Sequence, residues 1–273
     1  MNKVQRIIRT IRGGIERRAV TSLRRREYSL PDREPIVSFT FDDFPRSALE
    51  TGGKILKSHG GCGTYYAAMG LMGGAGKLGE YFSFEDLKSL LADGHELGSH
   101  TFSHLSCRTT PFPTFQSDAQ KGRDAIINFT GTPELHQFAY PYGHMTLRAK
   151  GQIGSQMNSC RSTLKGINTS PVDLHMLRAN NLYNGTIDLL AIEQLLRAND
   201  RRRGWLVFYT HDVRDNPSPW GCKPSQLEAV VRLATRMRAR FLTVGRVIAQ
   251  LEDAAGGTRE RRVLSPTRFS RSE

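Results

Sequence analysis

Residues 36–45 read IVSFTFDDFP, an apolar and β-branched run that stops at two adjacent carboxylates, Asp42 and Asp43. The run itself predicts a buried strand. Two like charges at the end of such a strand repel each other and resist transfer out of water. Acidic residues also end strands in ordinary solvated turns. The pair therefore indicates a functional site only if the chain supplies further ligands for a shared ion.

Two histidines supply such ligands. Residues 93–107 read DGHELGSHTFSHLSC, in which His100 and His104 lie four positions apart. On a helix or helical turn this spacing places both imidazoles on one face, where they can bind one divalent ion. Two histidines and one carboxylate, with positions left for water, form the usual hydrolytic zinc site. Together with the acidic pair, they predict a metal site at the end of the strand.

Two later runs also end in residues that suit a cleft. The apolar run WLVFYTHDV, residues 205–213, ends at His211 and Asp212. The carboxyl ends of strands in α/β folds gather at one face, where active sites form. The run FAYPYG, residues 138–143, predicts a strand and a tight turn whose backbone N–H groups can point into a cleft. An ordinary strand and turn is the alternative for this second run.

Strand-like and helix-like runs alternate along the chain, which favours an α/β fold. The strand-like runs are 36–41, 136–140 and 205–210, and the helix-like runs are 46–58, 84–93, 116–129, 187–199 and 224–239. The chain has 273 residues, of which 38% are hydrophobic, so it can bury a sizeable core as one domain. The glycine-rich run 70–79 lacks the lysine and hydroxyl ending of a phosphate loop. It predicts a flexible loop near the mouth of the cleft.

The motifs TFDD, HTFSH, PYG and THD, in this order, resemble the polysaccharide deacetylases, the NodB-homology group called carbohydrate esterase family 4. The resemblance spans about residues 36–250, and the FAYPYG form is similar to one branch of the family. It implies an α/β fold of the irregular (β/α) barrel type with about seven strands. It also implies an enzyme that hydrolyses acetyl groups from saccharides.

The resemblance implies a role for each motif residue. Asp43, His100 and His104 would bind a divalent metal, for which we expect Zn²⁺, with Co²⁺ or a similar ion as the alternative. Asp42 would be the general base, His211 the general acid that protonates the departing amine, and the backbone N–H of Tyr142 would face the oxyanion. These roles suit amide hydrolysis, because a bound metal acidifies water and positioned acid and base groups add roughly 10²- to 10⁴-fold in rate.

The chain departs from the family pattern at two positions. Many family members have Gly after the acidic pair, where this chain has Phe44. Many have an Arg that holds the base aspartate, and the aligned position here is Ala139. We expect Arg178, from another loop, to replace that Arg and hold Asp42. A surface or structural role is the alternative for Arg178.

Two further residues are candidates for supporting roles. We expect Asp173 to orient His211, with a structural role as the alternative. Trp220 lies in the loop that follows His211, where its ring can stack on a sugar or simply pack the loop.

The positive charge sits in the two tails. The formal net charge is +13; residues 1–26 hold nine Lys or Arg against one Glu, and residues 254–273 hold five Arg against two Glu. We therefore divide the chain into a basic N-terminal segment (1–30), a catalytic domain (31–253) and a disordered basic tail (254–273). The catalytic body itself is nearly neutral.

The N-terminal segment has a helical pattern. Its apolar residues recur on one face with arginines around them: Val4, Ile7, Ile8, Ile11 and Ile15. This pattern is typical of a basic amphipathic helix on an anionic membrane surface, so we expect peripheral membrane contact through residues 1–26. A solvated or domain-packed helix is the alternative. We expect no nucleic-acid partner, because no aromatic residue lies among the basic ones.

We expect a cytoplasmic protein, peripheral to the inner face of the membrane. The sequence shows no export signal, and its four cysteines are widely spaced without a Cys-x-x-Cys motif. The predicted function is therefore metal-dependent removal of acetyl groups from an N-acetylated or O-acetylated saccharide, a bacterial surface- or exopolysaccharide precursor. The alternatives are hydrolysis of a small non-sugar amide on the same scaffold, or a catalytically weak membrane-associated binding protein.

Overall fold

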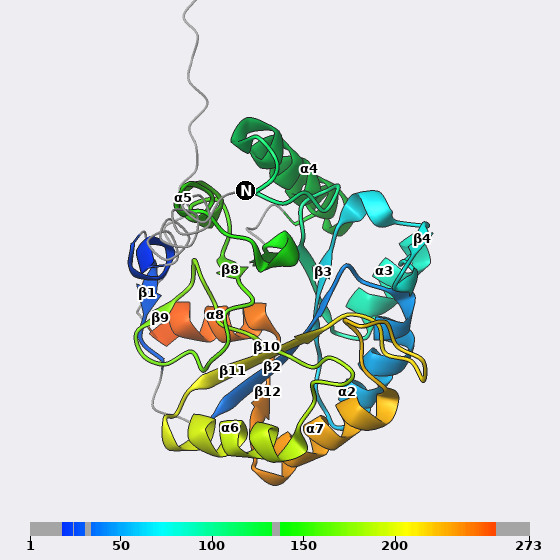
Figure 1. Ribbon diagram of the computed structural model, residues 1–273, viewed down its shortest axis with the longest axis vertical. Helices are drawn as coiled ribbons and strands as arrows, with labels where there is room; N and C mark the ends of the chain where they lie inside the picture. Colours follow the sequence, from blue (N-terminus) through cyan, green and yellow to red (C-terminus); the bar gives the residue numbers. More distant parts are fainter. Residues whose placement is uncertain (1–17, 24, 31–33, 133–136, 255–273) are drawn as a thin grey trace, which may run out of the picture.

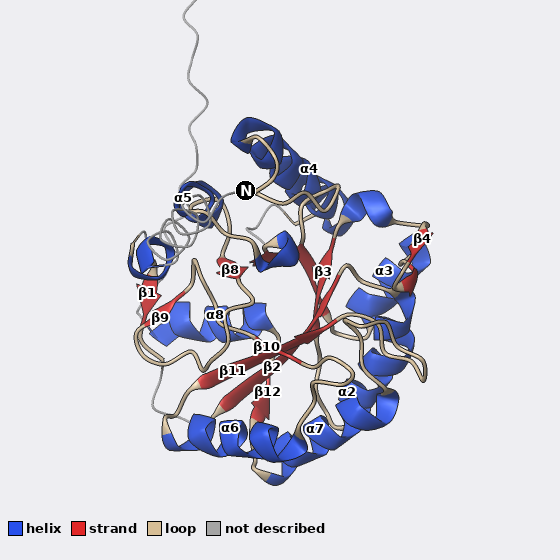
Figure 2. Ribbon diagram, viewed as in Figure 1, coloured by secondary structure: helices blue, strands red, loops and turns tan. Residues whose placement is uncertain are grey.

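A curled parallel sheet forms the centre of the molecule, and helices cover its outer side (Figures 1 and 2). The computed structural model describes residues 18–23, 25–30, 34–132 and 137–254. The sheet has the order β10–β11–β2–β3–β6–β7–β8, with β12 paired to β2. These strands are β2 (Ile36–Asp42), β3 (Thr64–Ala67), β6 (Glu96–Ser99), β7 (Gln137–Ala139), β8 (Ser159–Arg161), β10 (Asn180–Asn181), β11 (Trp205–Thr210) and β12 (Arg240–Phe241). This architecture confirms the predicted irregular (β/α) barrel.

The helices and two small strand pairs surround this sheet. The α-helices are α2 (Lys54–Ser58), α3 (Phe84–Ala92), α4 (Phe112–Thr130), α5 (Leu147–Gly154), α6 (Leu189–Arg201), α7 (Pro224–Arg236) and α8 (Val244–Ala254), and the shorter helical turns are η1 (Ala48–Gly53), η2 (Met69–Leu71) and η3 (Pro141–Gly143). Strand β1 (Glu27–Tyr28) pairs with β9 (Val172–Asp173), and β4 (Ala75–Gly76) pairs with β5 (Gly79–Glu80). The glycine-rich run predicted as a flexible loop therefore contains η2 and the β4–β5 hairpin.

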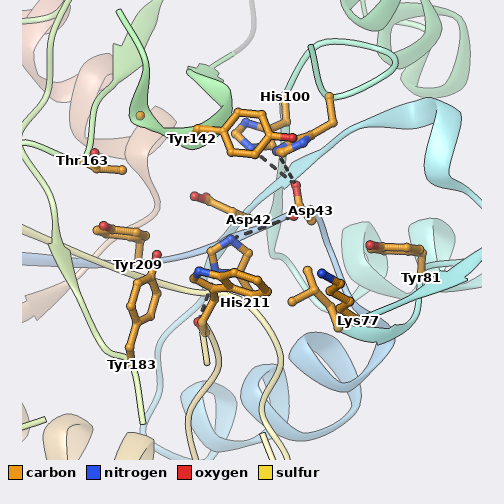
Figure 3. Close-up of a pocket in the computed structure, with 14 residues that line it drawn as sticks. Asp42, Asp43, Lys77, Tyr81, His100, Tyr142, Thr163, Tyr183, Tyr209 and His211 are labelled. Carbon is orange, nitrogen blue, oxygen red and sulfur yellow. Dashed lines mark hydrogen bonds and ion pairs between the residues drawn. The ribbon is translucent and has the colours of Figure 1, made fainter. Parts of the chain in front are cut away.

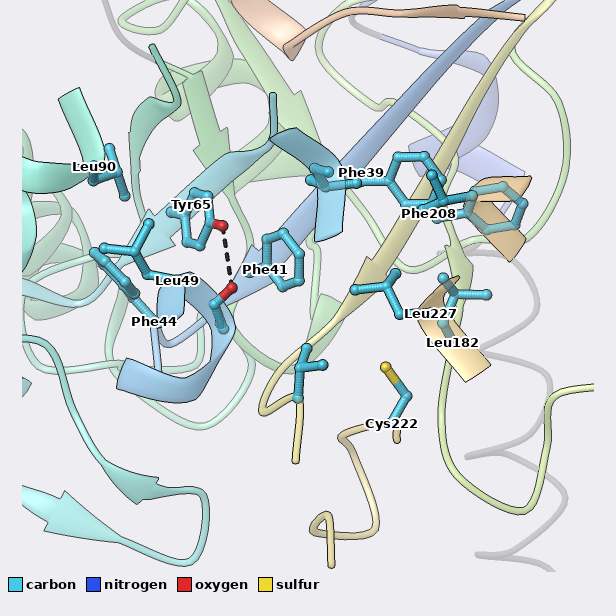
Figure 4. Close-up of a cluster of buried hydrophobic side chains, with 14 of the residues drawn as sticks. Phe39, Phe41, Phe44, Leu49, Tyr65, Leu90, Leu182, Phe208, Cys222 and Leu227 are labelled. Carbon is cyan, nitrogen blue, oxygen red and sulfur yellow. Dashed lines mark hydrogen bonds between the residues drawn. The ribbon is translucent and has the colours of Figure 1, made fainter. Parts of the chain in front are cut away.

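Strand β2 is buried along its whole length, and its two faces have different chemistry. Val37, Phe39 and Phe41 belong to the largest hydrophobic cluster (Figure 4). Because side chains alternate along a strand, Ser38 and Thr40 lie on the opposite face. Asp42 shares that polar face. The alternation of IVSFTFD thus places one face of β2 in the hydrophobic core. It places the carboxylate of Asp42 on the opposite, polar face.

Aromatic rings from neighbouring elements stack on the side chains of β2 and hold the end of the strand in place. The ring of Phe41 stacks on Tyr65 with a centroid distance of 4.7 Å, and Phe39 stacks on Phe208 at 5.6 Å. The Tyr65 hydroxyl donates to the carbonyl of Ala48 at 3.1 Å (Figure 4). Full burial of such a side chain stabilises the fold by roughly 1.5–3 kcal/mol.

The segment that begins at Leu177 closes the curled sheet. The N–H of Leu177 donates to the carbonyl of Cys160 on β8, and the carbonyl of Leu177 accepts from the N–H of Ser162. A few residues later, β10 pairs in parallel with β11. The chain therefore connects the β8 edge to the opposite edge of the sheet. The carboxyl ends of the strands consequently surround one opening.

The domain begins before the predicted boundary at residue 31. Residues 18–22 are helical, and Val20 is buried in a hydrophobic cluster with residues of α5. The ammonium of Lys150 donates to the carbonyl of Val20 at 2.7 Å and pairs with Asp173 at 2.6 Å. The first residues of the structure thus pack on the domain, together with β1.

Two of the predicted segments lie outside the described residues. These are the helical pattern from Val4 to Ile15 and the basic tail beyond residue 254. Within the described ranges, no helix is both long and apolar enough to cross a membrane.

Candidate active site

A cavity of about 470 Å³ opens at the carboxyl ends of the strands (Figure 3). This volume falls within the range of about 300–1,000 Å³ that is usual for small-molecule sites. Its lining includes the predicted residues Asp42, Asp43, His100, His104, Tyr142, His211 and Trp220. The structure thus brings together motifs that are up to 178 positions apart in the chain, from Asp42 to Trp220.

The acidic pair is presented by an unusual backbone. Asp43 and Phe44 have φ angles of +61° and +51°, in the left-handed region that favours glycine. The ring of Phe44 is fully buried and stacks on Phe82, with a centroid distance of 4.9 Å, and lies 5.0 Å from Tyr65. Aromatic packing therefore holds a strained turn that directs Asp43 into the cavity. The glycine of many family members would relieve the strain at this position.

The two histidines lie in a loop after β6, so it is not a helix or helical turn that brings their imidazoles to one side. Thr101 and His104 have φ angles of +62° and +55°, which are not helical values. Asp118 of α4 holds the loop by accepting from the N–H groups of Phe102, at 3.2 Å, and Ser103, at 2.9 Å. The imidazoles still converge because the left-handed residues curl the loop back on itself. Their ring centroids are 4.9 Å apart.

Asp43, His100 and His104 form a donor set that fits a divalent ion. One ligand atom from each lies within 4.8 Å of the other two. Nε2 of His104 is 3.1 Å from Oδ1 of Asp43, and Nε2 of His100 is 3.5 Å away (Figure 3). Among the described residues, this buried carboxylate oxygen accepts no hydrogen bond of acceptable geometry. A metal ion between the three groups would satisfy it.

The orientation of His100 also suits a metal ligand. Its Nδ1 lies 2.8 Å from the carbonyl oxygen of Ala139. A carbonyl can only accept, so Nδ1 carries the proton and donates. The lone pair of the imidazole is therefore on Nε2, which faces Asp43. A partner of this kind on the remote nitrogen is what fixes metal-binding histidines.

Burial sets the protonation states of the donor set. It lowers the pKa of His100 to about 3 and also lowers the pKa of His104. Burial raises the pKa of Asp43 to about 6, and the neighbouring charge of Asp42 adds to the rise. At neutral pH the set therefore holds two neutral imidazoles and an ionised carboxylate, which are the forms that bind a metal.

Asp42 is held by Arg161, which the sequence did not point to. One terminal nitrogen of the Arg161 guanidinium lies 2.6 Å from each carboxylate oxygen of Asp42. The arginine is fully buried, and its guanidinium lies over the rings of Tyr66 and Tyr209 at 5.2 and 4.9 Å. Burial raises the pKa of Asp42, but the charge of Arg161, helped by His100 and His211, leaves that pKa below its ordinary value.

Arg161 takes the place that was predicted for Arg178. The guanidinium of Arg178 instead donates to the carbonyl of Lys165 at 3.0 Å. Arg161 on β8 is the register partner of Ala139 on β7, the position where many family members carry their arginine. The guanidinium therefore comes from the adjacent strand. Its sequence signal is weak, a single arginine in the short run SCR, because strand register is not visible in the chain.

His211 is oriented by a main-chain carbonyl. Its Nδ1 lies 3.1 Å from the carbonyl oxygen of Trp220, so Nδ1 donates and Nε2 points into the cavity, 4.0 Å from Oδ2 of Asp43. Asp173, predicted to orient His211, lies instead on β9 and pairs with the buried ammonium of Lys150. That prediction is therefore wrong. Trp220 lines the cavity and is 42% exposed.

The PYG turn lies on the opposite side of the donor set from His211 (Figure 3). Tyr142 has a φ angle of +59°, and its exposed ring packs on His104 with a centroid distance of 4.5 Å. Gly143 follows at +62°, and a Cβ at this position would overlap Thr163. Glycine is therefore required where the turn meets Thr163, just after β8. The assignment of the Tyr142 N–H to an oxyanion stays a prediction.

Several cavity residues were missed by sequence reasoning. Lys77 and Leu78 are not among them, because they belong to the glycine-rich run that was predicted to lie near the mouth of the cleft. The missed residues are Tyr81, just after the β4–β5 hairpin, and Thr163, Tyr183 and Tyr209 on the opposite side (Figure 3). Of these, only Tyr209 lies in a recognised motif, in the run before His211. The others come from loops without a pattern, and their place in the cavity depends on tertiary structure.

Comparisons with known proteins support the family resemblance and the fold. A family model described as polysaccharide deacetylase matches residues 29–165. Bacillus subtilis PdaA, a family 4 carbohydrate esterase, has a similar structure, with a TM-score of 0.57 and 14% identity over 85% of this chain and 88% of that one. At this identity the likeness shows the fold alone. No curated protein matches the chain.

Two further solved structures have the same fold. The chitin deacetylase from the fungal pathogen Colletotrichum lindemuthianum has a TM-score of 0.54 and 18% identity, over 81% of this chain and 89% of that one. The Xyl-CE4 domain of a multidomain xylanase from the hindgut metagenome of Trinervitermes trinervoides has a TM-score of 0.52 and 16% identity, over 82% and 92%.

Proposed function

Because the chain belongs to the polysaccharide deacetylase family of hydrolases, we propose that it removes acetyl groups from an N-acetylated or O-acetylated saccharide with a divalent metal ion. The observation that carries the proposal is the convergence of Asp43, His100 and His104 beside Asp42 and His211 in one cavity. In this proposal the first three residues bind the metal, for which Zn²⁺ is our first choice. When bound, such an ion polarises the acetyl carbonyl and makes water acidic enough to react near neutral pH.

Asp42 acts in this proposal as the general base. Its carboxylate stays ionised at neutral pH because Arg161 holds its pKa below the ordinary value. Asp42 is the last residue of β2, beside the donor set, and it is not one of the three residues in that set. The arginine also fixes the direction of the carboxylate, so the base is oriented before the substrate arrives.

His211 acts as the general acid. An amine is a poor leaving group unless a proton reaches its nitrogen as the C–N bond breaks. The Trp220 carbonyl occupies Nδ1, so Nε2 is the atom that transfers the proton. The backbone N–H of Tyr142 stabilises the oxygen of the tetrahedral intermediate, a role that fits the left-handed turn at this residue.

The walls of the cavity support a saccharide over a small amide. Tyr142 and Trp220 are 62% and 42% exposed, and both line the cavity. Flat exposed rings of this kind can stack on sugar faces. The hydroxyl groups of Thr163, Tyr183 and Tyr209 line the same space and can hydrogen-bond to sugar hydroxyls.

For the physiological substrate we propose a bacterial surface- or exopolysaccharide precursor, reached in the cytoplasm at the inner face of the membrane. The nine basic residues in positions 1–26 support attraction to anionic lipid.

Acetate release across a panel of acetylated sugars and small cyclic amides tests the proposed chemistry. Asp42→Asn should keep the metal and lose at least about 10²-fold in kcat, because base catalysis is removed while ligation survives. His211→Ala should behave similarly. Near-wild-type turnover by both variants on the best acetylated sugar would show that the acid and base roles are wrong. Faster turnover of the cyclic amides would favour the non-sugar alternative.

A further inference from the structure

The carboxylate of Asp212 lies next to His211 in sequence but faces the inside of its own loop. Its side chain is fully buried. Oδ1 accepts from the hydroxyl of Ser218 at 2.5 Å, and Oδ2 accepts from the N–H of Ser218 at 2.8 Å and pairs with Nε of Arg214 at 2.8 Å. The buried charge is thus fully compensated by partners within a few residues. It does not line the cavity.

The loop from Asp212 to Cys222 folds around this carboxylate. The Ser218 hydroxyl, which donates to Asp212, accepts from the N–H of Trp220 at 3.2 Å. The N–H of Cys222 donates to the carbonyl of Asp212 at 2.9 Å. Gly221 lies so close to Asp212 that a Cβ there would overlap the carboxylate. The carboxylate therefore determines the path of residues 218–222.

That path delivers one carbonyl oxygen to His211. The carbonyl of Trp220 accepts from the backbone N–H of His211 at 3.2 Å and from its Nδ1 at 3.1 Å. Among the described residues, this is the hydrogen bond that the structure gives to the His211 ring. The tautomer and the direction of Nε2 consequently depend on where the loop holds Trp220.

Arg214 links Asp212 to the β4–β5 hairpin, which also borders the cavity. Its Nε pairs with Asp212, and a terminal nitrogen lies 3.4 Å from the carbonyl of Lys77, at the tip of the β4–β5 hairpin. The guanidinium also lies against Gly79, where a Cβ would be 3.0 Å from it. The buried carboxylate of Asp212 is thus connected to the loop of residues 218–222 directly and to the β4–β5 hairpin through Arg214.

We infer that Asp212 is a positioning residue for His211, acting through Ser218 and the carbonyl of Trp220. The inference rests on the proposed function, in which His211 is the general acid. A small displacement of Nε2 costs little in folding but much in proton transfer, because the donor must lie within hydrogen-bond reach of the departing nitrogen. Loss of Asp212 should therefore affect substrates in proportion to their need for a proton.

Asp118 provides a matched control carboxylate. It holds the loop of His104 through two backbone N–H groups, much as Asp212 holds the loop of His211. Asp118→Asn should weaken metal binding. Once the metal is saturating, its effect should be equal for all leaving groups. Asp212→Asn should leave metal content unchanged and produce a loss that depends on the leaving group.

The experiment compares wild type, Asp212→Asn, Asp118→Asn, His211→Ala and the double variant His211→Ala/Asp212→Asn, all with metal content measured. The probes are 4-nitrophenyl acetate, whose leaving group needs no proton, and the N-acetylated sugar from which wild type releases acetate fastest. For Asp212→Asn we expect one metal per chain, a kcat on the amide reduced at least about tenfold with little change in KM, and a smaller loss on the ester. The double variant should be no slower than His211→Ala alone.

Equal losses on the two probes, near-wild-type kcat on the amide, or an additive double variant would overturn the inference. If Asp212→Asn does not fold, Ser218→Ala replaces it, since it removes one donor without unpairing the charge from Arg214. Ser218→Ala must then also lose more kcat on the amide than on the ester, although both losses should be smaller than those expected for Asp212→Asn. If His211→Ala itself shows no larger loss on the amide, the proposed role of His211 has failed, and the inference fails with it.

Discussion

The guanidinium of Arg161 lies 2.6 Å from both carboxylate oxygens of Asp42 and is fully buried. Arg161 reaches the carboxylate from a register position opposite Ala139 on the neighbouring strand. The arginine that the family pattern places on one strand is thus supplied by the next. Despite Ala139, Asp42 is therefore paired with a buried arginine, and its pKa lies below the ordinary value.

Replacement of Arg161 should shift the pH dependence of activity. Without the positive charge, burial raises the pKa of Asp42, so the acid limb of kcat/KM in the metal-saturated enzyme should move to higher pH. Arg161→Met should also destabilise the fold by about 3–5 kcal/mol, because it leaves a buried charge unpaired. Arg161→Lys, which keeps the charge, should be milder in both respects.

Two comparison variants sharpen this prediction. Arg178→Ala should leave the pH profile unchanged, because its guanidinium contacts a carbonyl outside the cavity lining. Ala139→Arg combined with Arg161→Ala should recover part of the lost activity by moving the guanidinium back one strand. An unshifted acid limb in Arg161→Met, or a shifted one in Arg178→Ala, would contradict the pairing.

Metal affinity should fall with pH below about 6, where Asp43 becomes protonated. His100, with its pKa lowered to about 3, does not compete for protons in this range. Zn²⁺ affinity should therefore drop roughly fivefold from pH 6 to pH 5. Competition titrations against a chelator of known affinity would measure it. A constant affinity over this range would be inconsistent with Asp43 as a ligand.

The same pKa has a consequence for the metal-free protein. A raised pKa in the folded state means that protonated Asp43 favours folding, and this contribution is lost as the pH rises through about 6. A bound metal ion compensates the cost of burying the ionised Asp43 carboxylate. The difference in Tm between metal-bound and metal-free protein should therefore widen from pH 5 to pH 7.

Replacement of Phe44 by glycine should destabilise the fold less than replacement by alanine, the reverse of the usual order. Removing the buried ring costs roughly 3–5 kcal/mol in either variant. At a φ angle of +51°, however, glycine is favoured over alanine by roughly 1–2 kcal/mol. Phe44→Gly should therefore unfold at higher urea than Phe44→Ala. The reverse order would mean that the turn is not left-handed in solution.

Vesicle binding should depend on residues 1–17. These residues carry the helical pattern, whereas Val20 and the β1 strand contact the domain. Deletion of residues 1–17 should abolish salt-sensitive binding to anionic vesicles and leave activity on a soluble substrate intact. Deletion of residues 1–26 should also destabilise the domain, because Lys150 loses the Val20 carbonyl. Full-length protein that ignores anionic vesicles at low salt would refute the membrane proposal.

The fold and most of the cavity were predictable because their signals are local. The apolar run of β2 and the paired acids stand together in ten residues, and the histidine pair stands in five. Short strands such as β3, β6 and β8 were missed, since three or four residues are too few to show alternation. Their places in the sheet come from the core that they share with β2.

The features that escaped prediction are set by tertiary structure. Arg161 depends on the register between β7 and β8, and the loop of His100 and His104 depends on two left-handed residues and on Asp118. The spacing of the histidines was informative although the segment is not helical. Four positions also bring two side chains together in a tightly curled loop. The boundary at residue 31 failed because β1 finds its partner at residues 172–173.

The measurement that tests the central claim most directly is metal content coupled to acetate release, in wild type and in His100→Ala/His104→Ala. Wild type should bind one divalent ion per chain and release acetate from an acetylated sugar. It should stop when the metal is removed and recover when Zn²⁺ is restored. The double variant should lose both metal and hydrolysis, since Asp43 alone cannot retain the ion. Stoichiometric metal in the double variant, or acetate release that persists without metal, would contradict the account.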